Sequence, residues 1–168
     1  MPKIIANLES RLIEEAQKQI EEAGYGTMTI RSIAKACGVG VGTVYNYFSS
    51  KEDLVATHLL DDWKQCIAAI NAVSAYSDSP RPVALCIYDH LISFTLRHQK
   101  IFRDEAAAVI FADSAGKYHS ILREQLSKPL RKFCDSDFSA EFLAEALLTW
   151  TVAGICFDDI YGIIKKLF

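Results

Sequence analysis

Polar side chains that could bind a nucleic acid gather between Thr27 and Lys51. This segment has three basic residues, Arg31, Lys35 and Lys51, and no acidic residue, although the whole chain carries 18 basic and 21 acidic residues. A segment free of negative charge does not repel phosphate. An asparagine amide can make two hydrogen bonds to adenine, threonine or valine can contact a thymine methyl, and tyrosine hydroxyls and lysine suit phosphates. The positions are Thr29, Val41, Gly42, Thr43, Tyr45, Asn46, Tyr47 and Lys51.

Those side chains need a rigid support, and the spacing of three small or apolar residues predicts one. A helix-turn-helix needs a small residue where two helices cross, a turn residue that tolerates positive φ, and an apolar anchor on the second helix. Ala34, Gly38 and Val44 meet these needs at offsets of four and six residues. We therefore expect helices over residues 30–37 and 41–48. Packing of the small domain is the alternative role for Tyr45 and Tyr47.

The same sequence offers little for catalysis or metal binding. In the glycine-rich run 38–42 the third glycine comes one residue too early for a dinucleotide-binding loop, and the run follows a helical pattern. The four histidines form no H-x-x-x-H pair, and the five cysteines form no C-x-x-C pair. We also find no nucleophile with a paired base. The sequence predicts no enzyme, no metal and no cofactor.

Helical spacing of apolar residues recurs along the whole chain. A first amphipathic helix stops at Gly24, and a long helix to about Tyr76 begins after a capping box, either Ser49 with Glu52 or Ser50 with Asp53. Further helical stripes follow, with a break near Lys128 before Pro129 and a last helix over residues 139–166. No stretch shows the alternation of a half-buried strand. The sequence predicts an all-α fold.

Several short motifs in the first third of the chain form a recognisable set. They are Ala23-Gly24-Tyr25, Thr29, Ile33-Ala34, Gly38-Val39, the run from Gly42 to Phe48, and Ser50-Lys51-Glu52-Asp53-Leu54. This set resembles the N-terminal domain of the TetR family of repressors. The resemblance implies a three-helix DNA-binding head over residues 1–50. It also implies a connecting fourth helix and a variable helical domain for a ligand and for dimerisation, over residues 51–168.

The resemblance also implies which residues contact an operator. These are Thr29, Arg31, Val41, Gly42, Thr43, Tyr45, Asn46, Tyr47 and Lys51. The chain departs from the family at Gly40 and Val41, where a capping serine and a polar reader are frequent. Glycine caps a helix only a few tenths of a kcal/mol worse than serine. Because Val41 cannot hydrogen-bond a base, shape and phosphate contacts are expected to carry more of the affinity.

The last helix is apolar on almost every side, and such a helix must be covered on every side. A second copy of the chain is the natural cover in so short a protein, which predicts a two-fold homodimer on a palindromic double-stranded DNA operator. Burial inside one protomer is the alternative. The residues expected at the dimer interface are Phe142, Leu147, Trp150, Ala153, Gly154 and Phe157.

The helices before the last one are expected to form a pocket for a small-molecule effector that releases the repressor. Candidate wall residues, which core packing would explain equally well, are Trp63, Tyr88, His90, Phe94, Phe111 and Tyr118. With no apolar run long enough for a membrane span and no export signal, we expect a cytoplasmic protein. The alternative function is a TetR-like protein-interaction or co-activator module with weak or no operator binding.

Overall fold

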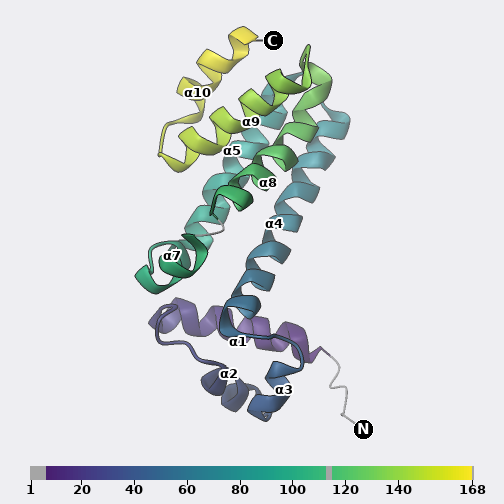
Figure 1. Cartoon of the computed structure of the whole chain (residues 1–168). Helices are drawn as coiled ribbons and strands as arrows, with labels where there is room; N and C mark the ends of the chain where they lie inside the picture. Colours follow the sequence, from purple (N-terminus) through teal and green to yellow (C-terminus); the bar gives the residue numbers. More distant parts are fainter. Residues whose placement is uncertain (1–6, 113–114, 168) are drawn as a thin grey trace. The chain divides into compact units, whose positions relative to one another are not determined.

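The computed structural model describes residues 7–112 and 115–167, with side chains at all of these positions except 110–112, 115–117 and 167. Every regular element in the described residues is helical, which confirms the all-α prediction (Figure 1). The elements are α1 (Leu8–Ala23), α2 (Ile30–Cys37), α3 (Val41–Tyr45), α4 (Lys51–Tyr76), α5 (Pro80–Arg97), α6 (Gln99–Phe102), α7 (Glu105–Ala112), α8 (Ala115–Ser127), the 3-10 helix η1 (Lys128–Phe133), α9 (Asp137–Val152), α10 (Phe157–Ile164) and the 3-10 helix η2 (Lys165–Leu167). None of the described helices is long and apolar enough to cross a membrane.

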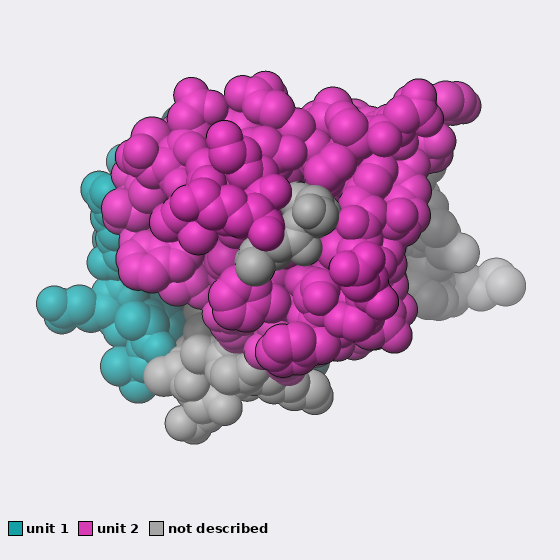
Figure 2. Space-filling model, turned by 90° about the horizontal axis from the view of Figure 1, so that it is seen from above, with its two compact units in different colours: residues 1–61, 98–112 teal, residues 62–97, 113–168 magenta. Residues whose placement is uncertain are grey.

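The chain forms two compact units, which Figure 2 colours separately. The first unit combines residues 1–61 with residues 98–112, and the second combines residues 62–97 with residues 113–168. The start of α4 and the α6–α7 segment pack with the N-terminal helices because Leu54, Val55, Ile101 and Ala107 all enter that core. The functional division at residue 50 remains a prediction, and the packing boundary lies elsewhere.

The core of the first unit is built on the fourfold spacing along α1. Leu8, Leu12, Ala16 and Ile20 are all buried on one face of that helix, as the apolar pattern predicted. They pack with apolar residues of α2 and α3 and with the segments that flank them, among them Tyr25, Met28, Ile33, Val44 and Phe48. α1 ends at Gly24, whose φ of 87° is a conformation that glycine adopts without strain. This core fixes the position of α3.

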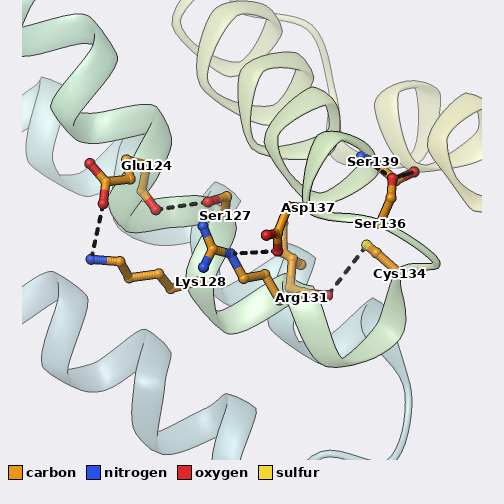
Figure 3. A network of polar contacts seen from close by, with 9 residues as sticks. Glu124, Ser127, Lys128, Arg131, Cys134, Ser136, Asp137 and Ser139 are labelled. Carbon is orange, nitrogen blue, oxygen red and sulfur yellow. Dashed lines mark hydrogen bonds and ion pairs between the residues drawn. The ribbon is translucent and has the colours of Figure 1, made fainter.

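The second unit has its own core between α4, α5, α8, α9 and α10. Ile70, Ile87, Leu126 and Leu143 are fully buried in it. Polar contacts fix the passage from α8 through η1 into α9 (Figure 3): Lys128 pairs with Glu124 at 3.3 Å, and Arg131 pairs with Asp137 at 3.3 Å. The break predicted near Lys128 is confirmed, since η1 begins at that residue.

Two helix boundaries differ from the prediction. α3 ends at Tyr45 rather than at Phe48, although the Phe48 N–H still bonds to the Val44 carbonyl at 3.0 Å. The last helix, expected to run unbroken over residues 139–166, is divided into α9 and α10. The break contains Gly154 with a φ of 84°, and apolar periodicity alone could not reveal it. α10 therefore packs back on α9 and α5 instead of extending α9.

Candidate nucleic-acid interface

The turn between α2 and α3 has the geometry of a helix-turn-helix. Thr29 caps α2 by accepting a hydrogen bond from the Ser32 N–H at 3.1 Å. At the other end Gly38 adopts a φ of 70°, and the N–H groups of Gly38 and Val39 bond to the carbonyls of Lys35 and Ala34. This is a Schellman motif, which ends a helix and turns the chain sharply. The predicted positive φ at Gly38 is confirmed.

α3 and the residues that follow it, up to Phe48, carry six of the nine residues predicted to contact DNA. Val44 and Phe48 are buried, as predicted for the anchors of this segment. Tyr45 is 52% exposed and Tyr47 is 36% exposed, so neither ring serves mainly to fill the core. Asn46 and Gly42 are also exposed, whereas Val41 and Thr43 are half-buried. The surface thus offers one amide and two phenol hydroxyls to a partner.

An open cleft of about 490 Å³ lies beside this face, and five of the nine predicted contact residues line it. Its walls include Gly26, Thr29, Arg31, Val41, Tyr45 and Lys51. Residues from the start of α2, from α3 and from the start of α4 therefore meet at one place. The arginine and the lysine give the cleft two positive charges, which suits it to a phosphate group.

The Lys51 ammonium is held by two contacts with Tyr25, which the sequence alone did not indicate. Its Nζ donates a hydrogen bond to the Tyr25 carbonyl oxygen at 2.5 Å and lies 3.9 Å from the centre of the Tyr25 ring. Burial lowers the pKa of the Lys51 ammonium, while the nearby Glu52 and Asp104 carboxylates oppose that shift. The Tyr25 hydroxyl in turn donates to Glu52 at 3.2 Å. The ammonium is thus held at the cleft wall and does not swing freely in solvent.

The start of α4 resolves the two capping alternatives. The Ser50 hydroxyl accepts a hydrogen bond from the Asp53 N–H at 3.1 Å, and the Asp53 carboxylate accepts one from the Ser49 N–H at 2.8 Å. Ser50 is therefore the cap residue of α4, and the Asp53 carboxylate bonds back to Ser49 instead of to Ser50. These bonds fix the first turn of α4, and with it the position of Lys51.

Sequence reasoning missed Asp104, which lies directly before α7. Its carboxylate accepts hydrogen bonds from the N–H groups of Ala106, Ala107 and Gly26 at 3.0, 3.1 and 3.1 Å. The backbone hydrogen bond from Ala107 is the largest cause that lowers the pKa of this carboxyl. Gly26 is 78 residues away in the sequence, and no local pattern marks a contact of that kind. Asp104 thus joins the loop at the cleft to α7.

Five of the six predicted pocket residues have described side chains, and none of these five lines the cleft beside α3. Trp63 is buried, donates to Gln125 at 2.6 Å and meets Phe94 edge to face at 5.4 Å between ring centres. Tyr88 packs against the Phe157 ring instead, His90 is half-buried, and Tyr118 is exposed. The side chain of Phe111 lies outside the described residues. Core packing accounts for Trp63 and Phe94.

The predicted dimer residues divide into an exposed and a buried group. Phe142 and Trp150 are 51% and 54% exposed, and they line an apolar groove of about 280 Å³ with Ile155 and Ile163. Ala153 and Gly154 are exposed at the break between α9 and α10. Leu147 and Phe157 are instead buried inside the protomer, so neither offers its side chain to a partner. They are covered because α10 folds back toward α5 and α9.

Residues 12–57, which span the capped helices and the turn just described, match the family model "Bacterial regulatory proteins, tetR family". This N-terminal domain belongs to the TetR family. Among curated TetR-like relatives, the HTH-type transcriptional regulator HbdR of Aromatoleum sp. (strain CIB) is 36% identical over 67 residues, which are 38% of this chain and 29% of HbdR. UidR of Escherichia coli is 30% identical over 59 residues, 35% of this chain and 30% of UidR. The matches thus span less than a third of these relatives.

Solved structures show that the TetR-like fold extends over the whole chain. A protein from Streptomyces coelicolor A3(2) has a TM-score of 0.71 and 16% identity, with 96% of this chain and 98% of that chain covered. The TetR family regulator CifR, solved with 26bp double-strand operator DNA, has a TM-score of 0.60 and 14% identity, with 99% of this chain and 97% of the CifR chain covered. FadR of Bacillus subtilis, solved with stearoyl-CoA, has a TM-score of 0.54 and 19% identity over 94% of both chains.

Proposed function

We propose that this TetR-family chain is a DNA-binding transcriptional regulator that acts as a homodimer, and that it is a repressor released by a small-molecule effector. The observation that carries the proposal is the convergence of Thr29, Arg31, Tyr45 and Lys51 on one cleft beside the exposed face of α3. Groups that bind phosphate and a helix that can read bases are thereby brought together within a single rigid unit.

In this proposal α3 enters the major groove, and the cleft binds the phosphate backbone that borders this groove. The exposed Asn46 amide is the group best suited to read a base, since it can bond to adenine through two atoms. Thr29, Arg31, Tyr45 and Lys51 contact phosphates and fix the register. Val41 and Gly42 contribute shape, because neither can hydrogen-bond through its side chain.

A second copy of the chain is the proposed cover of the apolar groove on α9 and α10. Phe142, Trp150 and Ile163 expose large apolar side chains there, and their burial would favour association. In a two-fold dimer the two α3 helices would enter successive major grooves of a palindromic operator. The centres of the two half-sites would then be roughly 34–36 Å apart. This geometry supports the dimer that the sequence predicted.

The proposed effector binds in the second unit, which the TetR resemblance assigns to ligand binding. Support comes from the stearoyl-CoA complex of FadR, which has the same fold. An effector can release DNA only by its higher affinity for the conformation that does not fit the operator. We therefore expect an apolar or aromatic ligand to lower operator affinity without competing for the cleft.

Fluorescence anisotropy with a labelled duplex from the region upstream of the chain's own gene tests this function. The proposal expects binding that weakens with salt, with a logarithmic slope of about 0.9 for each phosphate that the protein neutralises. It also expects the variants Y45A and K51A to bind at least tenfold more weakly while circular dichroism stays unchanged. A folded dimer without salt-dependent affinity for any duplex would contradict the proposal and favour the protein-interaction module.

A further inference from the structure

The peptide group between Tyr25 and Gly26 is bonded at both ends by charged side chains. Its carbonyl oxygen accepts from the Lys51 ammonium at 2.5 Å, and its N–H donates to the Asp104 carboxylate at 3.1 Å. The carbonyl of Tyr25 and the amide of Gly26 belong to one planar unit, so neither can turn without the other. A carboxylate and an ammonium thus act on the same peptide group from opposite ends.

Asp104 is itself fixed by α7. Its second oxygen accepts from the N–H groups of Ala106 and Ala107 at 3.0 and 3.1 Å, which makes it the cap of that helix. The carboxylate therefore cannot follow a moving loop without giving up these two bonds. The Asp104 side chain thus connects the first turn of α7 to the loop at residues 25–26.

The other side of this arrangement lies at the cleft beside α3. Both Gly26 and Lys51 line that cleft, and Lys51 reaches it from the first turn of α4. The direction of the ammonium depends on where the Tyr25 carbonyl points, because that carbonyl is its acceptor. The orientation of the peptide therefore helps to set where the ammonium points within the cleft.

We propose that Asp104 is a positioning residue of the DNA-contacting cleft, acting on the Lys51 ammonium through the peptide group between Tyr25 and Gly26. This role rests on the proposed DNA-binding function. It gives the start of α7, a segment outside the helix-turn-helix, a direct influence on phosphate binding. A carboxylate that served only as a helix cap would have no such influence.

The variant D104N separates the two roles. Asparagine caps helices about as well as aspartate, so its oxygen can keep the bonds from Ala106 and Ala107. Its amide nitrogen then faces the Gly26 N–H, where donor meets donor, and the hydrogen bond cannot form. The exposed neighbour Glu105 supplies the control, since E105Q removes the same charge one residue away.

The test measures the affinity of the full-length protein for the labelled upstream duplex at one salt concentration. D104N should bind three- to tenfold more weakly than the wild type, whereas E105Q should stay within twofold. In a K51M background D104N should add less than twofold, because its target is gone. Equal affinities of D104N and E105Q, or an undiminished effect of D104N in the K51M background, would overturn this role. If wild-type protein binds no duplex, the proposed function fails and this role fails with it.

Discussion

The Arg81 guanidinium on α5 lies over the Phe157 ring of α10, 5.4 Å from its centre, and also pairs with Asp158 at 3.3 Å. The two ionic side chains are 54% and 85% exposed, so the ion pair itself contributes little in water. The interaction with the ring is worth about 0.5–1 kcal/mol at an exposed site, and the arginine stem adds apolar cover. Arg81 therefore holds α10 mainly through the aromatic ring.

The first prediction separates these two contributions. R81A should lower the free energy of unfolding by about 1 kcal/mol, because it removes both the cation–π interaction and the packing of the arginine stem. D158N should change it by less than about 0.5 kcal/mol, as expected for an exposed pair. Urea denaturation followed by circular dichroism measures both. A greater destabilisation by D158N than by R81A would show that the ion pair is the main link.

A second prediction concerns the apolar groove on α9 and α10. W150E places a charge in the proposed dimer interface, where Trp150 is 54% exposed in the single chain, and should shift the protein to monomers. Y76E is the matched control, since Tyr76 is 91% exposed and does not line the groove. Light scattering after gel filtration gives the molar mass. If W150E keeps the mass of the wild type, the groove is not the interface.

The fold and the helix-turn-helix that supports the candidate interface could be predicted from the sequence because both depend on local patterns. The fourfold spacing along α1 and the positive φ at Gly38 follow from residue type and short-range geometry. The break at Gly154 was missed, since a helix apolar on all sides looks the same whether it is continuous or folded back. Asp104 was missed because its bond to Gly26 crosses 78 residues. Burial of Leu147 depends likewise on where α10 packs.

A third prediction follows from the lowered pKa of Asp104. A carboxyl whose pKa is lower in the folded than in the unfolded protein stabilises the fold above its unfolded pKa of about 3.9. This contribution disappears as the pH falls through the folded pKa. As the pH falls below about 4, the free energy of unfolding should therefore decline less steeply in D104N than in the wild type. Urea midpoints measured from pH 6 to pH 2.5 give both slopes, and parallel slopes would contradict the prediction.

The last prediction uses Gly42, where folding and DNA binding make opposite demands. Gly42 is in α3, its φ is not positive, and a Cβ built there meets nothing within 4 Å. Alanine favours a helix over glycine by up to about 1 kcal/mol, so G42A should raise the unfolding midpoint. The added methyl, however, projects from the face that approaches the DNA backbone, and affinity for the upstream duplex should fall at least fivefold. G162A in α10 is the matched control, because it also adds a methyl in open space within a helix and should leave affinity within twofold. A more stable G42A protein with unchanged affinity would show that DNA does not approach this face of α3.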